Sequence, residues 1–204
     1  VPYYNVTEQG NFEKKNILNV KQTLSVFSKA NGFHIDQVRD RLQEAREKLL
    51  EVRNKRIRPL LDDKILASWN GLAIIAYAKA GRVLKNKDLI SKAEKSCQFI
   101  FDKLTTPEGR LFRRYREGEA KYDAYLCDYA SVALACLELY EATYKPEYLD
   151  KARGLMQIVV EKFAADNGAF YETAEDAEKL IVRQISGYDG VEPSGNSAAA
   201  MAFL

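Results

Sequence analysis

The chain has 204 residues, 47% of them hydrophobic and 29% charged, a balance that argues against intrinsic disorder and favours a packed core. Its 31 basic and 29 acidic side chains leave a net charge of only +2, which gives no support to a nucleic-acid partner or an anionic membrane surface. The longest apolar run, residues 129–137, cannot cross a membrane, since a transmembrane helix needs about 20 residues.

Three cysteines, Cys97, Cys127 and Cys136, stand in apolar surroundings without CxxC spacing. This pattern is more typical of buried free thiols in a reducing compartment than of a redox or metal site. His34 is the only histidine, which excludes a multi-histidine metal site within these residues. No secretory signal is visible, so we expect a cytoplasmic protein with no metal and no cofactor.

The first helical pattern covers residues 36–55, where apolar residues recur at four- and three-residue steps behind Asp36, the expected N-cap. Residues 65–84 are apolar almost all round, so we expect this helix to be covered on most sides. Residues 88–104 predict an amphipathic helix. A β-hairpin is expected next, with a first strand at residues 110–116, a turn at residues 117–119 and a second strand from Lys121.

The same order of elements returns 59 residues later, as in the pair Gly109 and Gly168. Residues 125–144 repeat the fully apolar helix, and the next helix has an apolar residue at each inward position of the first amphipathic helix. A second hairpin is expected from residues 169–173 and 180–184. A third copy begins at Ser194 and reaches Leu204 within its first helix.

Self-similarity at this period is typical of a repeat array, in which each unit buries its apolar face against its neighbours. The alternation of fully apolar and amphipathic helices indicates an inner and an outer layer. We therefore predict an all-α fold, an incomplete α/α toroid with short β-hairpins between helix pairs. Residues 1–204 are expected to form one partial toroid domain.

Polar groups gather in the three loops that lead into the fully apolar helices, and we expect these loops to open on one face of the array. A site there would take its residues from all three loops. The candidates are Asp62, Asp63, Trp69, Asn70, Asp128, Tyr129, Asp189, Ser194 and Asn196.

Carboxylates together with aromatic rings suit a carbohydrate site, because one acid can protonate a leaving oxygen and a second can act as base or nucleophile. The catalytic candidates are Asp62, Asp63 and Asp128, with Asp63 or Asp128 as general acid or base. Trp69 and Tyr129 are expected to be platforms for a sugar ring, and Asn196 a clamp for a sugar hydroxyl. The other substrate-binding candidates are Asn70, Asp189 and Ser194.

A structural interpretation stands beside each of these roles. The acids and Ser194 stand where helix N-caps belong, and there they would satisfy unpaired amides. Trp69 lies within an apolar helix and could equally pack in the core. The four arginines of the first predicted strand could grip an anion, although a solvated strand face is the simpler interpretation. These arginines are Arg110, Arg113, Arg114 and Arg116.

Several phrases together make the chain resemble the YyaL-type proteins, the family that includes the spermatogenesis-associated thioredoxin-like protein. The resemblance covers essentially the whole chain. It rests on YNVTEQGNFE at 4–13, RP at 58–59, DDKIL at 62–66, SWNGL at 68–72, DYA at 128–130, DG at 189–190 and PSGNS at 193–197.

The resemblance implies an N-terminal thioredoxin-like domain followed by an (α/α)6 toroid similar to six-hairpin glycosidases and sugar epimerases. This chain would then be part of the toroid, without the thioredoxin-like domain and the closing helices. The related epimerases use histidines as acid and base. Only His34 is present here, away from the motif loops, so the resemblance does not extend to epimerase chemistry.

Two functions remain open at this point. The first is a carbohydrate-binding or carbohydrate-processing toroid with acid–base chemistry on a sugar. The second is a non-catalytic interaction scaffold that works with an upstream thioredoxin-like domain. A repeat array that stops within a repeat leaves apolar faces uncovered, so self-association or instability of the isolated chain is also expected.

Overall fold

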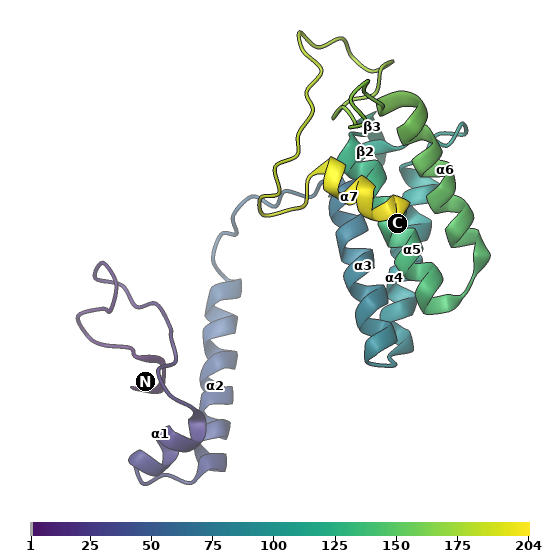
Figure 1. Ribbon diagram of the computed structural model, residues 1–204. Coiled ribbons are helices and arrows are strands. Elements are labelled where there is room, and N and C mark those ends of the chain that lie inside the picture. Colours follow the sequence, from purple (N-terminus) through teal and green to yellow (C-terminus); the bar gives the residue numbers. More distant parts are fainter. Residues whose placement is uncertain (1) are drawn as a thin grey trace. The chain divides into compact units, whose positions relative to one another are not determined.

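The computed structural model describes residues 2–204 and divides the chain into two compact units, Val1–Leu61 and Asp62–Leu204 (Figure 1). The first unit contains a short 3-10 helix η1 (Pro2–Tyr4) and two helices, α1 (Leu24–Ala30) and α2 (Ile35–Asn54). The expectation of a single domain over residues 1–204 stays a prediction.

The helix expected at residues 36–55 is confirmed as α2, but its N-cap is His34, and Asp36 lies in the first turn. A small core forms where α2 packs against α1, through Phe27, Val38 and Leu42. The later residues of the expected apolar stripe, Leu49 and Val52, are about half exposed within this unit.

The second unit has two layers of helices. The helices α3 (Ala67–Val83), α5 (Leu126–Thr143) and α7 (Gly195–Phe203) lie side by side, with α5 between the other two (Figure 1). The amphipathic helix α4 (Lys87–Lys103) packs on α3, and α6 (Pro146–Phe163) packs on α5. The nearly all-apolar helices are thus the inner layer and the amphipathic helices the outer layer, as the sequence predicted.

The 59-residue repeat is visible in the backbone hydrogen bonds. A bridge joins Thr105 to Leu111, and the matching bridge joins Ala164 to Phe170. The turn glycines Gly109 and Gly168 both have positive φ, +84° and +82°, a conformation that glycine adopts without strain. Each repeat therefore leaves its outer helix through the same turn.

Three short strands form an antiparallel sheet in the order β1 (Ile65–Leu66), β2 (Phe112–Arg116) and β3 (Glu119–Asp123). The hairpin β2–β3 confirms the first predicted hairpin. Arg114 of β2 pairs with Lys121 of β3 on one side and with Leu66 of β1 on the other. The hairpin is therefore attached to the chain that enters α3.

The second predicted hairpin, residues 169–173 with 180–184, is wrong as a strand pair. Within the described residues, one backbone–backbone hydrogen bond joins the two segments, from the Glu172 amide to the Gln184 carbonyl at 2.8 Å. The Asn196 side chain accepts a hydrogen bond from the Phe170 amide and donates one to the Phe170 carbonyl, and the Leu126 amide donates to the Glu172 carbonyl. With these groups occupied, a regular ladder cannot form.

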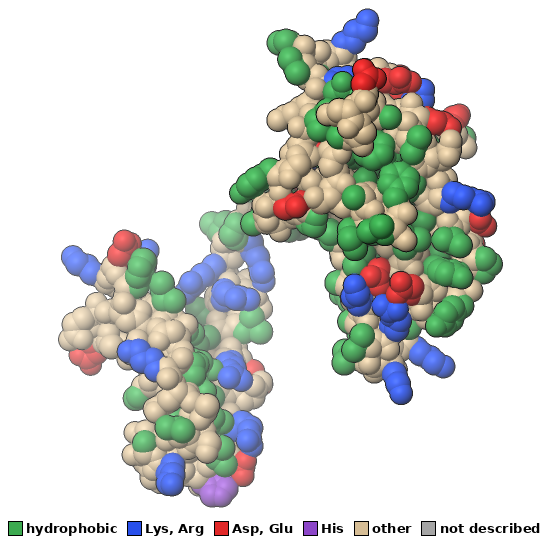
Figure 2. Space-filling model, viewed as in Figure 1, with side chains coloured by type: hydrophobic (Ala, Val, Ile, Leu, Met, Phe, Trp, Pro, Cys, Tyr) green, Lys and Arg blue, Asp and Glu red, His purple; other side chains and the backbone are tan. Residues whose placement is uncertain are grey.

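The third copy is confirmed as α7, which begins after Ser194; the Ser194 Oγ accepts a hydrogen bond from the Ser197 amide at 3.1 Å. This helix leaves Met201 and Phe203 at least half exposed, and Figure 2 shows hydrophobic side chains gathered on this face of the second unit. No helix of residues 2–204 is long and apolar enough to cross a membrane.

The inner helices α3 and α5 approach each other closely at Gly71. A Cβ atom built at Gly71 would lie 2.8 Å from the Ser131 carbonyl carbon and oxygen, so α3 and α5 meet there at backbone distance. We expect Gly71→Ala to destabilise the chain by about 1–3 kcal/mol, because the helices must move apart. Urea denaturation measures this change.

The matched control is Gly154→Ala on α6, where a Cβ atom would meet nothing within 4 Å. Alanine has a higher helix propensity than glycine, so this variant should be neutral or more stable by roughly 0.5–1 kcal/mol. Equal stability changes in the two variants would contradict the close packing of α3 on α5.

Candidate functional site

The Asp128 carboxylate joins three elements at the start of the inner helices. Its side chain is fully buried in the first turn of α5. One oxygen, Oδ1, accepts a hydrogen bond from the Ser68 amide in the first turn of α3 at 2.9 Å. The other, Oδ2, accepts from the Tyr125 amide at 2.9 Å and from Arg113 of β2 at 3.1 Å.

Burial raises the pKa of the Asp128 carboxyl, while the Tyr125 amide, Arg113 and the Ser68 amide act in the opposite direction. An acid with a raised pKa holds its proton closer to neutral pH, as a general acid requires. Both oxygens are nevertheless engaged by fixed donors. The contacts therefore show a capping and joining group for two helices and a strand.

The two aromatic candidates have opposite environments. Trp69 is 59% exposed and can offer its ring to a ligand. Tyr129 is 1% exposed, its ring packs edge-on against Phe163, and its hydroxyl accepts from the Leu111 amide at 3.0 Å. Tyr129 therefore packs the core, and the expectation of a ring platform is corrected to Trp69 alone.

The other two acids stand at the surface. Asp62 pairs with Lys64 at 3.2 Å, and hydrogen bonds from Lys64 lower the pKa of the Asp62 carboxyl. Asp63 pairs with Arg116 at 2.6 Å. Asp63 and Asp128 are thus bound by different arginines of β2, Arg116 and Arg113.

The third loop uses its polar groups to build the start of α7. The Asp189 carboxylate accepts from the Ser194 amide at 2.8 Å and from the Ser197 hydroxyl at 3.1 Å, and these bonds lower its pKa. Asn196 donates to the Phe170 and Ser186 carbonyls, both at 2.9 Å, and accepts from the Phe170 amide. Both N–H groups of its amide donate to the backbone and its oxygen accepts from the backbone, so Asn196 ties segments together and has no free donor for a sugar hydroxyl.

The three loops meet at one end of the inner helices. The Ser68–Asp128 bond joins the first loop to the second. The third approaches the second at Gly195, where a Cβ atom would lie 2.9 Å from the Leu126 side chain. A cavity of about 110 Å³ opens beside this contact, and its lining residues come from all three inner helices. They include Leu72, Cys127, Ser131, Ser197 and Met201. Asn70, two residues before Leu72, donates to the Leu66 carbonyl at 2.9 Å.

Glu172 is a polar group that the sequence analysis missed. One oxygen of its carboxylate is enclosed without a hydrogen-bond partner in the described chain, and burial raises its pKa. Its negative charge and that of Asp128 add to the burial that raises the pKa of Cys127 to about 11, so this thiol stays protonated at neutral pH. Glu172 lies 59 residues after Arg113, so the second repeat has a negative side chain where the first has a positive one. This change of charge is the feature of the sequence that could have identified Glu172.

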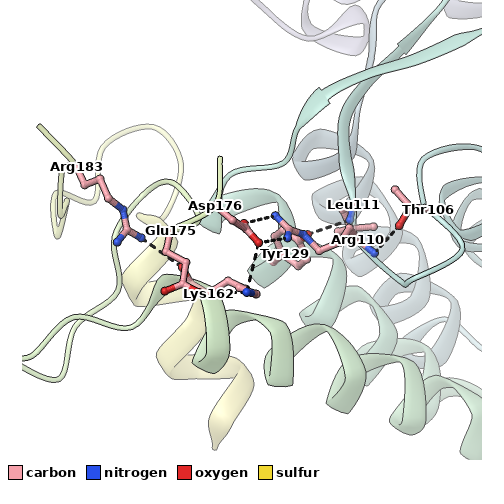
Figure 3. A network of polar contacts seen from close by, with 8 residues as sticks. All are labelled: Thr106, Arg110, Leu111, Tyr129, Lys162, Glu175, Asp176 and Arg183. Atoms are coloured by element: carbon pink, nitrogen blue, oxygen red, sulfur yellow. Dashed lines mark hydrogen bonds and ion pairs between the residues drawn. The ribbon is translucent and has the colours of Figure 1, made fainter. Parts of the chain in front are cut away.

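A network of ion pairs fixes the segment that follows Glu172 (Figure 3). Arg110 binds Asp176 through two hydrogen bonds, at 2.9 and 3.0 Å. Lys162 pairs with the same Asp176 at 3.3 Å and with Glu175 at 3.1 Å. Three of the four arginines of the first predicted strand thus pair with carboxylates of the protein, Arg110 with Asp176, Arg113 with Asp128 and Arg116 with Asp63.

We expect Asp128→Asn to destabilise the chain by about 2–4 kcal/mol. The nitrogen that replaces one carboxylate oxygen cannot accept a hydrogen bond, so one of the two helix amides loses its partner, and Arg113 loses its counter-charge. Urea denaturation followed by circular dichroism measures the effect. Asp166→Asn, at an exposed turn position, is the control and should change stability by less than about 0.5 kcal/mol. A loss no larger than the control's would show that Asp128 does not hold the helix starts together.

The pKa of Asp176 is lowered by its hydrogen bonds from Arg110 and by Lys162. A lowered pKa in the folded state means that this stabilisation is present above the ordinary value of 3.8 and is lost as the pH falls through the lowered value. The stability difference between wild type and Asp176→Asn should therefore be largest at neutral pH and disappear in acid. Denaturation at several pH values tests this.

The control is Asp150→Asn, which removes an exposed pair with Arg153. Exposed pairs contribute little, so its stability difference should be small throughout. A difference for Asp176→Asn that does not change with pH would contradict an ionic role for Asp176.

No protein-family model matches the chain. Spermatogenesis-associated protein 20 of Homo sapiens is 32% identical over 226 residues, which cover 99% of this chain and 28% of that protein. The chain thus spans less than a third of the length of this relative. The resemblance found in the sequence is confirmed along the whole chain.

Solved structures show the fold. Cellobiose 2-epimerase from Bacillus thermoamylovorans superposes with a TM-score of 0.56 at 18% identity, over 69% of this chain and 38% of that one. A family 105 glycoside hydrolase of C. acetobutylicum also gives 0.56, at 13% identity, over 88% of this chain and 53% of that one. The chain is therefore a homologue, along its length, of a segment of spermatogenesis-associated protein 20, and it has the fold of six-hairpin glycosidase-like toroids.

Proposed function

We propose that the second unit binds a carbohydrate on the face where the inner helices α3, α5 and α7 begin. The observation that carries this proposal is the meeting of the three loops, joined by the Ser68–Asp128 bond and by the contact of Gly195 with Leu126. The names of the structural neighbours, a cellobiose epimerase and a glycoside hydrolase, support it through the shared fold. Fold alone does not define a reaction, so the proposal rests on the site.

Trp69 is the proposed platform for a sugar ring, because it is the exposed aromatic residue in the first turn of α3. Among the three predicted catalytic acids, Asp63 is the best placed to contact a ligand. It is half exposed and has a single partner, Arg116, whereas Asp128 is enclosed by three donors. Asn70, in the same turn as Trp69, is proposed to contact the ligand beside it.

We do not assign two-carboxylate glycoside hydrolysis to the pair Asp63 and Asp128. That chemistry places both carboxyl groups roughly 5–10 Å apart across one cleft. Here Asp128 is buried and bound by three donors, whereas Asp63 lies at the surface and pairs with a different arginine. The proposed activity is sugar binding with Asp63 as one contacting carboxylate.

A screen of mono- and oligosaccharides against the full chain tests the proposal. A bound sugar should raise the melting temperature by several degrees at about 100 times its Kd. It should also change the emission of Trp69, the only tryptophan of the chain. Trp69→Ala and Asp63→Asn should each weaken the thermal shift at least several-fold.

Tyr144→Ala is the control, because Tyr144 is an exposed aromatic residue at the opposite end of α5. This variant should respond to the sugar as wild type does. If no saccharide raises the melting temperature although all the proteins are folded, the carbohydrate proposal is excluded.

One observation favours a second function, a non-catalytic interaction scaffold. Four of the candidate residues form their hydrogen bonds with other parts of the protein, while α7 leaves apolar side chains uncovered. These residues are Asp128, Asp189, Ser194 and Asn196. If no saccharide binds, and a protein partner binds wild type but not Met201→Ser, the scaffold function would be supported.

A further inference from the structure

The cavity of about 110 Å³ at the start of the inner helices is lined by α5, α3, α7 and the loop that leads into α7. Cys127, Ser131 and Leu134 lie at helical spacing on α5, so they form one stripe on that helix. Leu72 of α3 adds to the lining. The third loop and α7 supply the rest, which is Glu192, Pro193, Ser197, Ala198 and Met201.

Ser131 carries the observation that points to a ligand. It is 6% exposed, it lines the cavity, and its hydroxyl forms no hydrogen bond within residues 2–204. Serine in a helix often bonds the carbonyl four residues earlier, but this hydroxyl does not. Its oxygen is not fully enclosed by protein atoms, in contrast to that of Thr173, so it is open to the cavity.

The position of Ser131 within the repeat is otherwise apolar. Ser131 interrupts the apolar run of residues 129–137, and its counterpart 59 residues earlier is Leu72. The side chain is also fixed in place, because a Cβ atom built at Gly71 would lie only 2.9 Å from the Ser131 Cβ. A hydroxyl held where α3 and α5 pack closely is a pre-organised binding group.

The other polar groups of the cavity differ in their availability. The Ser197 hydroxyl is already bonded to Asp189 at 3.1 Å and to Ser194 at 3.0 Å. The thiol of Cys127, whose pKa is raised to about 11, stays protonated and is only a weak donor. Glu192 is exposed, and its carboxylate forms no ion pair within residues 2–204. The Ser131 hydroxyl and the Glu192 carboxylate are therefore the groups that a ligand can use.

The size and the lining of the cavity select the group that it can take. Pockets for whole ligands measure about 300–1,000 Å³, so this cavity suits a substituent of a few heavy atoms. Most of the lining is apolar, and the substituent therefore needs a carbon as well as a hydroxyl. The hydroxymethyl group of a hexose has this composition.

The proposed platform for a sugar ring lies beside the cavity. Trp69 and Leu72 are three residues apart on α3, so they are neighbours on the surface of that helix. Trp69 is exposed, whereas Leu72 lines the cavity. A sugar ring packed on Trp69 would therefore have the cavity within reach of its exocyclic group.

We propose that this cavity takes the hydroxymethyl group of a hexose, with its hydroxyl paired to the Ser131 hydroxyl and with Glu192 accepting from another hydroxyl of the sugar at the mouth. This inference rests on the proposed function, that this unit binds carbohydrate. It adds the class of sugar, a hexose with a free hydroxymethyl group, and two contacting residues.

The test measures the affinity of the full chain by calorimetry for three kinds of sugar. The probes are glucose and mannose, their 6-deoxy forms, and the pentoses xylose and lyxose. A 6-deoxy form should bind about three- to ten-fold more weakly than its hexose, because one neutral hydrogen bond is lost. The pentose, which also lacks the carbon, should bind more weakly again by roughly a further few-fold.

Ser131→Ala should weaken the hexose by the same factor as removal of the sugar hydroxyl, and leave the 6-deoxy form within about two-fold of wild type. Glu192→Gln should weaken the hexose and its 6-deoxy form alike, since Glu192 contacts a different hydroxyl. The matched control is Ser96→Ala on the outer helix α4, which does not line the cavity and should bind as wild type does.

Equal binding of a hexose and its 6-deoxy form by wild type would overturn this inference and leave the proposed function standing. The same conclusion would follow if Ser131→Ala weakened both sugars equally or neither of them. If no hexose binds wild type, this inference fails, and the proposed function fails with it only when the whole saccharide screen is negative.

Discussion

The arrangement of the second unit depends on one buried carboxylate. Asp128 accepts hydrogen bonds from the amides that open α3 and α5 and from Arg113 of β2. The first amides of a helix have no partner within the helix, and burying them unpaired is costly. By accepting hydrogen bonds from the starts of two helices, Asp128 brings α3 and α5 to a common level, and the cavity lined by Leu72, Cys127 and Ser197 opens near that level.

The repeat and its two layers could be predicted because they are written in local patterns. Apolar residues all round a helix, one apolar stripe on the next, and a glycine turn return after 59 residues, and the structure repeats the same bridges and positive-φ turns. The second hairpin could not be predicted, since its failure has a distant cause. The side chain of Asn196, 26 residues away, takes the backbone groups of Phe170 that a strand partner would need.

The site could be predicted in position but not in the role of each residue. The loops that enter the inner helices do meet, yet a helix that is apolar all round does not reveal which side chain faces the core. For this reason Trp69 and Tyr129 looked alike in the sequence and are 59% and 1% exposed in the structure. Glu172 belongs to no motif, and although its change of charge within the repeat is visible in the sequence, only the fold shows that one of its carboxylate oxygens is enclosed and unpaired in the described chain.

The close contact at Gly71 has a wider consequence for the array. Gly71 is the fifth residue of α3, and the fifth residues of α5 and α7 are Ala130 and Ala199, both fully buried. At this position of the repeat each inner helix therefore carries a side chain of at most one methyl group. Where α3 meets α5, Gly71 lies against the backbone of Ser131, so the spacing of these neighbouring helices, and with it the curvature of the layer beside the binding face, is set there by backbone contact.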